Sequence, residues 1–342
     1  MKRQLLGVAA ILLSISTYAQ DNPLWMRYCA ISPDGTTIAF TYKGDIYTVP
    51  STGGRASQIT TNPAHDTKPI WSPDGKKIAF ASDRMGSMDI FEVNKEGGIP
   101  KRLTTHSGNE TPVAYKDAGH ILFLANIMPT AEDAQFPSGQ FQQVYEVNTE
   151  GGRPILFSSM PMEDISINHT GNTLLYHDKK GYEDPWRKHH TSSITRDIWL
   201  CSLNGNRTFR KQTAFNGEDR TPVWASDDKS FYYLSEEKGS FNIFKRDIDG
   251  NTSKQITNHT KHPVRFLSAA SNGTLCYGYD GEIYTVKEGA IPQKVQISIV
   301  TDKNDKDLIR QIKRSGATEI SLSPDAKEIA FVLRGDVYVT ST

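Results

Sequence analysis

Short apolar runs recur along the chain, and each follows a turn-forming group by a few residues. Three copies are nearly identical, with Ser-Pro-Asp ahead of Ile-Ala-Phe, and four weaker copies keep the same order. The seven runs are Ile38-Ala39-Phe40, Ile78-Ala79-Phe80, Ile121-Leu122-Phe123, Leu174-Leu175-Tyr176, Phe231-Tyr232-Tyr233, Leu275-Cys276-Tyr277 and Ile329-Ala330-Phe331. Short runs rich in β-branched and aromatic residues, bounded by turn residues, predict β-strands.

Each apolar run is followed by a second signature, a polar residue, then Ile or Val, then an aromatic residue. The seven copies are Asp45-Ile46-Tyr47, Asp89-Ile90-Phe91, Gln143-Val144-Tyr145, Asp197-Ile198-Trp199, Asn242-Ile243-Phe244, Glu282-Ile283-Tyr284 and Asp336-Val337-Tyr338. This composition is typical of a half-buried strand. A glycine turn and a short polar strand, such as residues 57–60 or 101–104, come next in most copies. The pattern therefore predicts four short strands per repeat, the outermost one polar.

The Ser-Pro-Asp-Gly group at residues 32–35 has a physical reason to form a tight turn. Proline fixes φ, the aspartate carboxylate can accept hydrogen bonds from nearby backbone N–H groups, and glycine accommodates a positive φ. We expect each such turn to set the register of the hairpin that follows it.

The repeats predict an all-β protein, a β-propeller of four-stranded blades. Neighbouring turns lie 40 to 57 residues apart, the repeat length of such blades, and radial packing buries faces that a lone blade would expose. We expect six blades within residues 22–300, a charged spacer at 301–317, and an incomplete blade at 318–342 that begins a second propeller. The alternative is a seven-bladed ring in which another strand completes the last blade.

Successive strands of a blade run in opposite directions, so the connections between them alternate between the two faces of the propeller. The Pro-Asp-Gly and Gly-Gly turns share one face, while second-to-third strand connections and blade-to-blade connections share the other. The two long insertions, residues 124–142 and 177–196, occupy second-to-third connections. Binding residues concentrate on long loops, so we expect any local function on this second face.

Polar residues just ahead of the first strands are candidates for a mixed-charge channel rim that contacts a partner. They are Asp66, Glu110, Glu163, Asp164, Asp219, Arg220 and His262. Further candidates lie in the second insertion: Trp186, Arg187, Lys188, His189 and His190. The competing interpretation makes the first group ordinary solvated loop residues and the second a loop that packs its tryptophan beside a basic surface.

No catalytic, cofactor-binding or metal-binding residue is predicted. Adjacent histidines on an extended segment point apart, and no third ligand stands at a recognised spacing from His189 and His190. The chain also lacks a Gly-x-Ser-x-Gly elbow, a His-Glu-x-x-His helix, a P-loop and a Cys-x-x-Cys pair, the one-segment signatures of common hydrolases, zinc sites and nucleotide sites.

The N-terminus has the pattern of a secretory signal peptide, with Lys2 and Arg3, an apolar run over residues 5–15, and a small-x-small site ending at Ala19. We therefore expect residues 1–19 to be removed and the protein to be periplasmic or extracellular. Removal leaves 37 basic against 39 acidic side chains, from the 39 of each in the full chain, so no nucleic-acid partner is expected. No later run is long enough to span a membrane.

The three cysteines, Cys29, Cys201 and Cys276, lie far apart in strand-like runs. An odd number cannot form a closed disulfide framework. We expect buried free thiols.

Residues 71–80 (Trp-Ser-Pro-Asp-Gly-Lys-Lys-Ile-Ala-Phe), the Asp89-Ile90-Phe91 triplet and the polar strand at 101–104 resemble the repeats of TolB-like proteins and of the tricorn protease family. The order of six repeats, a charged spacer and a further repeat resembles the first part of exported bacterial tricorn-like serine peptidases. The resemblance implies a six-bladed propeller followed by a seven-bladed one, a PDZ-like module and a protease domain. No catalytic residue of that family has a matching position in this chain.

Three functions remain open from the sequence. The first is a non-catalytic, substrate-gating or docking propeller of a tricorn-like serine peptidase that acts on peptides, with homo-oligomerisation of the longer protein possible. The second is a free-standing TolB-like periplasmic propeller that binds a protein partner. The third is a propeller enzyme that acts on carbohydrate or peptide at the channel rim.

Overall fold

The computed structural model describes residues 23–127, 141–181, 184, 194–300 and 313–342, and every regular element in these residues is a β-strand. The strands form six four-stranded antiparallel sheets, one three-stranded sheet and one short parallel pair. The predicted all-β class is confirmed.

The first three four-stranded sheets follow the chain in order, each beginning with its innermost strand. Their strands are β1 (Arg27–Ile31), β2 (Thr37–Tyr42), β3 (Asp45–Pro50) and β5 (Ser57–Gln58); β6 (Asp66–Trp71), β7 (Lys77–Ser82), β8 (Asp89–Asn94) and β9 (Lys101–Arg102); and β10 (Thr111–Asp117), β11 (His120–Ala125), β12 (Gln143–Asn148) and β13 (Ile155–Ser158).

The next three sheets repeat this plan. Their strands are β14 (Met162–Ile167), β15 (Thr173–Asp178), β16 (Ile198–Ser202) and β17 (Thr208–Lys211); β18 (Asp219–Trp224), β19 (Ser230–Ser235), β20 (Asn242–Asp247) and β21 (Ser253–Gln255); and β22 (Arg265–Ala269), β23 (Leu275–Tyr279), β24 (Glu282–Val286) and β25 (Gln293–Lys294).

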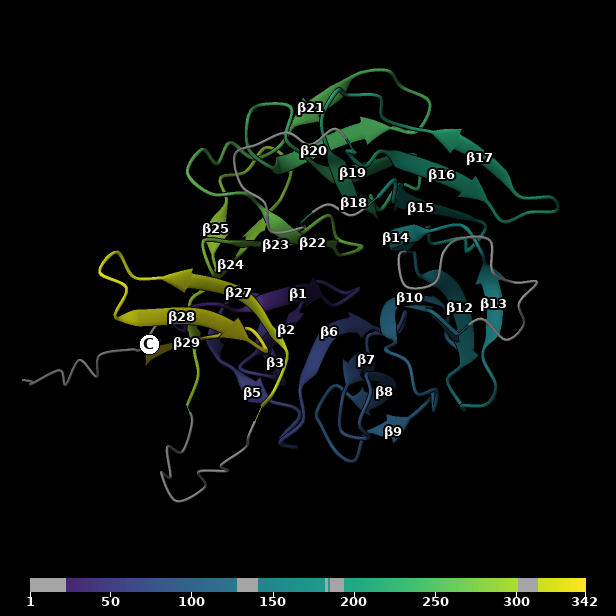
Figure 1. Ribbon diagram of the computed structural model, residues 1–342. Coiled ribbons are helices and arrows are strands. Elements are labelled where there is room, and N and C mark those ends of the chain that lie inside the picture. Colours follow the sequence, from purple (N-terminus) through teal and green to yellow (C-terminus); the bar gives the residue numbers. More distant parts are fainter. Residues whose placement is uncertain (1–22, 128–140, 182–183, 185–193, 301–312) are drawn as a thin grey trace, which may run out of the picture.

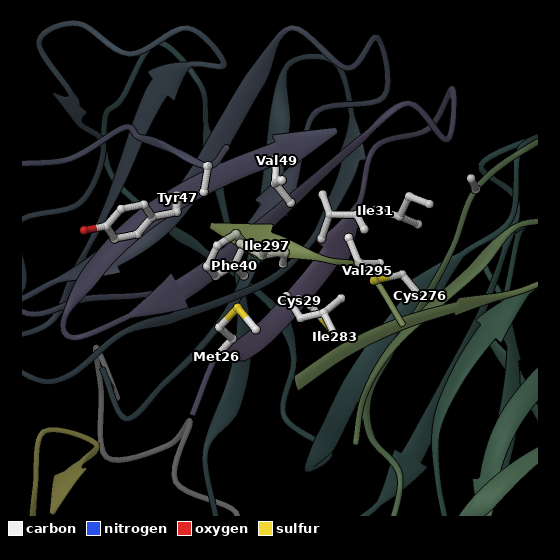
Figure 2. Packing of buried hydrophobic residues seen from close by; sticks show 13 residues of the cluster. Met26, Cys29, Ile31, Phe40, Tyr47, Val49, Cys276, Ile283, Val295 and Ile297 are labelled. Carbon is white, nitrogen blue, oxygen red and sulfur yellow. The ribbon is translucent and has the colours of Figure 1, made fainter. Parts of the chain in front are cut away.

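The six sheets surround a common axis, with the first strand of each sheet nearest to it (Figure 1). One apolar cluster fills each space between neighbouring sheets, and every cluster draws buried side chains from both of its sheets. The sixth cluster joins the last sheet to the first and combines Phe40 and Met26 with Ile283 and Val295 (Figure 2). These six sheets therefore form a closed ring held together by packing between faces.

A directly opposed aromatic pair recurs in all seven repeats, between the second and third strands. The pairs are Phe40 with Tyr47, Phe80 with Phe91, Phe123 with Tyr145, Tyr176 with Trp199, Tyr233 with Phe244, Tyr277 with Tyr284, and Phe331 with Tyr338. Opposed aromatic side chains stabilise one strand register over its alternatives. The two sequence signatures of each repeat thus meet across the same hairpin.

The Ser-Pro-Asp-Gly turns have the geometry that their residue types predict. The Asp74 carboxylate accepts hydrogen bonds from the Ser72 hydroxyl at 2.7 Å and from the Lys76 N–H at 3.1 Å, while the Lys77 N–H donates to Ser72 Oγ at 2.9 Å. Gly75 has a φ of 67°. These hydrogen bonds to the charged carboxylate lower the pKa of Asp74.

The ring also closes through backbone pairing between segments from its two ends. Strand β26 (Ile297–Ser298), which follows the last sheet, pairs in parallel with β4 (Gly54–Arg55) of the first repeat. Gly53 has a φ of 93° and lies against Gln296, the residue just before β26. A Cβ at position 53 would stand 2.7 Å from the Gln296 carbonyl oxygen. Glycine is required at this contact both for its φ and for its lack of a side chain.

Strands β27 (Ala317–Leu322), β28 (Glu328–Leu333) and β29 (Asp336–Ser341) form the three-stranded sheet, which lies beside the ring (Figure 1). Its apolar side chains are largely exposed, Ile320 at 72% and Val339 at 62%. The turn between β28 and β29 reaches the ring, where Arg334 forms an ion pair with Asp83 at 3.6 Å.

The expected separation of connections onto two faces is confirmed for the described residues. Second-to-third connections hydrogen bond to blade-to-blade connections, as where the Asp66 N–H donates to the Gly44 carbonyl and the Glu110 N–H donates to the Met88 carbonyl. Both insertions fall between second and third strands, after β11 and after β15. The three cysteines are buried and free, as predicted.

Candidate functional site

The innermost strands carry a repeated distortion beside the axis of the ring. The pairing register shifts in the first strand of every four-stranded sheet. In five of the six, a non-glycine residue at the bulge has a positive φ: Tyr28 (51°), Lys68 (54°), Asp164 (48°), Thr221 (53°) and Phe266 (57°). We call these five the axial residues.

A left-handed backbone costs a non-glycine residue about 1 kcal/mol or more. Glycine would remove that cost, yet none of the five axial positions has it. Such strain persists where the side chain itself is needed, and it clusters at binding and catalytic sites. The axial residues are therefore the first candidates for a functional site in this ring.

Three axial residues form an aromatic and cationic group across the junction of the sixth, first and second sheets. The Tyr28 and Phe266 rings lie 4.8 Å apart between centroids in a tilted arrangement. Lys68 Nζ stands 5.7 Å from the Tyr28 ring centroid, within the range of a cation–π interaction. This side of the axis offers flat apolar surface and one positive charge.

The other two axial residues form a polar group between the fourth and fifth sheets. The Thr221 hydroxyl donates to Asp164 Oδ2 at 2.7 Å, and the Thr221 N–H donates to Nδ1 of the buried His177 at 3.2 Å. Because Nδ1 accepts that hydrogen bond, His177 carries its proton on Nε2, which lies 3.3 Å from Glu163 Oε2. This side of the axis offers the exposed carboxylate of Asp164, which the Thr221 hydroxyl holds in place.

Among the sequence-predicted rim residues, Asp66, Glu110 and Asp219 are buried inside their blades. Asp66 accepts two hydrogen bonds of 3.0 Å from the guanidinium of Arg84, which stacks over Phe91. Glu110 contacts the Thr104 hydroxyl. Burial raises the pKa of Glu110 to about 7 and that of Asp219 to about 6.

A charged network surrounds Glu163 at the base of the second insertion. Lys179 Nζ lies 2.7 Å from Glu163, and Arg196 lies 2.9 Å from Glu218 and 3.6 Å from Glu163. Although burial alone would raise it, the hydrogen bonds from His177 and Lys179 and the positive charge of Lys179 together hold the pKa of Glu163 well below its usual range. Glu163 is therefore ionised and fixed in place.

The remaining predicted residues are divided between the ring and a segment outside the described residues. Arg220 lies 3.5 Å from Glu218, and its guanidinium stands 4.1 Å from the Phe241 ring centroid. His262 Nε2 lies 3.2 Å from Asp280. Trp186, Arg187, Lys188, His189 and His190 lie outside the described residues. Only Asp164, among all predicted site residues, is also an axial residue.

Comparison with known proteins identifies the relatives of this ring. Residues 23–290 match the family described as the tricorn protease N-terminal beta propeller domain. The chain belongs to the tricorn protease family. The match covers all of the first five sheets and β22, β23 and β24 of the sixth.

Curated members of the tricorn family align with most of this chain. Tricorn protease homolog 1 of Streptomyces coelicolor is 25% identical over 281 residues, which cover 81% of this chain and 25% of that protein. The tricorn protease of Thermoplasma acidophilum is 25% identical over 328 residues, 92% of this chain and 29% of that protein. The chain spans about a quarter of the length of these relatives.

A solved crystal structure of the tricorn protease has the same fold. It superposes with a TM-score of 0.67 at 21% sequence identity, covering 93% of this chain and 30% of that one. Among the described residues, no group of three or more histidine, cysteine or acidic side chains is placed to hold a metal ion, and no helix is long and apolar enough to cross a membrane.

Four of the five axial residues, all but Asp164, were not predicted from the sequence, although the five share one position in the repeat. Tyr28, Lys68, Asp164, Thr221 and Phe266 each stand four residues ahead of the first residue of the following turn. Their side chains are chemically unrelated, so no residue pattern marks them. The spacing of four residues ahead of the turn was the one feature of the sequence that could have marked these positions. That spacing becomes informative only once the structure shows a β-bulge there.

Proposed function

We propose that this ring is a non-catalytic docking and gating propeller of a tricorn-type serine peptidase, and that it contacts extended peptides through its axial residues. The observation that carries this proposal is the strained backbone at Tyr28, Lys68, Asp164, Thr221 and Phe266. The family match supports the link to peptidases.

The chemistry of the axial residues suits an extended peptide of varied sequence. The Tyr28 and Phe266 rings offer apolar contact to side chains of many kinds. Lys68 can pair with a carboxylate, including a peptide C-terminus, and Asp164 can accept hydrogen bonds from amide or ammonium groups. Lys68 and Asp164 carry opposite charges and belong to different sheets, so together they would favour one orientation of a bound peptide.

We expect Lys68→Gly to weaken peptide binding about tenfold, because the variant loses one charged contact worth about 1.4 kcal/mol. The matched control is Lys43→Gly. Lys43 also has a positive φ, 51°, and stands over an aromatic ring, that of Tyr42, but in a turn between β2 and β3. Fluorescence anisotropy with a labelled random-sequence oligopeptide pool measures both.

Glycine relieves backbone strain at either position, so both variants should be at least as stable as the parent. A loss of binding confined to Lys68→Gly then reflects the lost contact and not a damaged fold. Equal binding by the two variants would contradict a docking role for the axial residues.

We also propose that the ring is a complete six-bladed propeller and that residues 318–342 begin another one, with residues 301–317 as the spacer. The apolar cluster between the sixth and first sheets supports a ring that needs no further blade. The three-stranded sheet repeats the Phe331 and Tyr338 pair, with ring centroids 5.5 Å apart, yet keeps its apolar side chains exposed. Such exposure suits a blade that packs against further sheets.

We propose in addition that the protein is exported, on the basis of the signal-like pattern in residues 1–19. When the full chain is expressed in a bacterium, the mature protein should begin at Gln20 and appear in the periplasmic or extracellular fraction. Intact-mass measurement of the fractionated protein checks this. A cytoplasmic product that retains the first nineteen residues would contradict it.

A further inference from the structure

Cys29 and Cys276 meet at the place where the ring closes. Cys29 belongs to β1 of the first sheet and Cys276 to β23 of the last, 247 residues later in the chain. Both are buried, with exposed fractions of 4% and 0%, in the cluster that joins these two sheets (Figure 2).

The backbones of the two cysteines are held on either side of one serine hydroxyl. Ser268 Oγ lies 3.5 Å from the Cys29 carbonyl oxygen and 3.4 Å from the Cys276 carbonyl oxygen, and it accepts a 3.0 Å hydrogen bond from the Ile31 N–H. The Cys29 thiol donates to the Phe266 carbonyl oxygen at 3.5 Å. The Cys29 thiol is also near enough to Cys276 to raise the pKa of the Cys276 thiol.

The third cysteine has a different environment. Cys201 lies in the cluster between the third and fourth sheets, which contains no other cysteine. It has no thiol partner within its cluster and therefore serves as an internal reference for the other two.

We propose that Cys29 and Cys276 form a disulfide that locks the first sheet to the last when the chain folds in the presence of a thiol oxidant. Two thiols lose two protons and two electrons as the S–S bond forms. A disulfide oxidant such as oxidised glutathione accepts them and leaves as two thiols, by way of a mixed disulfide on one cysteine.

The structure also implies when this reaction takes place. In the closed ring both thiols are shielded from solvent, and burial together with the neighbouring Cys29 thiol raises the pKa of Cys276 well above its usual value. The reactive thiolate is thereby suppressed in the native state. We infer that the bond forms before β1 packs against β23 and is then protected from reduction.

The expected consequence is a ring that resists opening. A link between residues so far apart in sequence restricts the unfolded chain over most of its length. The oxidised protein should therefore unfold at a higher temperature than the reduced one, by about 5 °C.

The test uses purified protein that is denatured, then refolded either in glutathione redox buffer or in dithiothreitol. After a second denaturation, free thiols are labelled with N-ethylmaleimide and intact masses are measured. We expect one labelled thiol after oxidative refolding and three after reductive refolding, with a tryptic fragment pair joined through Cys29 and Cys276.

The matched control is Cys201→Ser, which should keep the disulfide and lose the one labelled thiol, whereas Cys29→Ser should abolish the disulfide. The wild-type masses decide the matter even where a variant folds poorly. Three labelled thiols after oxidative refolding, or a fragment pair that contains Cys201, would overturn the proposal.

Discussion

Replacing Arg84 with methionine should lower the free energy of unfolding by about 3 kcal/mol, because it leaves the buried Asp66 carboxylate without its charged partner. Arg84 Nη2 lies 3.0 Å from both Asp66 carboxylate oxygens, and the exposed fractions of the two side chains are 12% and 0%. Methionine keeps much of the packing against Phe91, so the lost charge dominates. Urea denaturation followed by circular dichroism measures the change.

The control for this variant is a surface ion pair of shorter distance. Lys101 Nζ lies 2.7 Å from Glu150, with exposed side-chain fractions of 45% and 83%. Because water screens such a pair, Lys101→Met should leave the free energy of unfolding almost unchanged. If Arg84→Met and Lys101→Met lower the free energy of unfolding by similar amounts, burial does not strengthen the contribution of the Arg84–Asp66 ion pair to stability.

The second large effect concerns ring closure. Gly53→Ala should destabilise the fold by about 3 kcal/mol, since alanine meets both an unfavourable φ and the Gln296 carbonyl oxygen 2.7 Å from its Cβ. Gly97 occupies the same position in the next repeat at a φ of 94°, but a Cβ there would meet its nearest atom, the Ile59 carbonyl oxygen, only at 3.6 Å. Gly97→Ala should therefore cost about 1 kcal/mol, the strain alone.

The difference between these two glycine variants isolates the contact between β4 and the segment that carries β26. Thermal and urea unfolding of both variants measure it. If Gly53→Ala and Gly97→Ala lose the same stability, the parallel pairing of β4 with β26 does not hold the ends of the ring together.

The repeat was predictable because its determinants are local. The Ser72 hydroxyl and the Asp74 carboxylate belong to one turn, so their hydrogen bonds require only adjacent residues. The Phe80 and Phe91 pair belongs to one hairpin, so its register follows from that turn and the apolar pattern. Interactions between residues that are close in the chain leave a residue pattern, so the strands and turns that they form can be predicted from sequence.

The positions of the charged residues predicted for the channel rim depend on contacts between residues far apart in the chain, which the sequence does not reveal. Asp66 was expected at an exposed rim, but the chain brings Arg84, eighteen residues later, onto both of its carboxylate oxygens. Thr221 and Asp164 come from different sheets and meet only because the ring packs them together. Long-range contacts between chemically dissimilar residues leave no sequence pattern, so the axial residues other than Asp164 could be identified only from the structure.

The central claim, that extended peptides contact the axial residues, is tested most directly by photo-crosslinking. Phe266 at the axis and Phe209, 39% exposed on the outer strand β17, are each replaced by p-benzoylphenylalanine and irradiated with a biotinylated random-sequence oligopeptide pool. We predict crosslinking at position 266 that unlabelled peptide competes away, with only background at position 209. Equal crosslinking at the two positions, or none at 266, would contradict the claim.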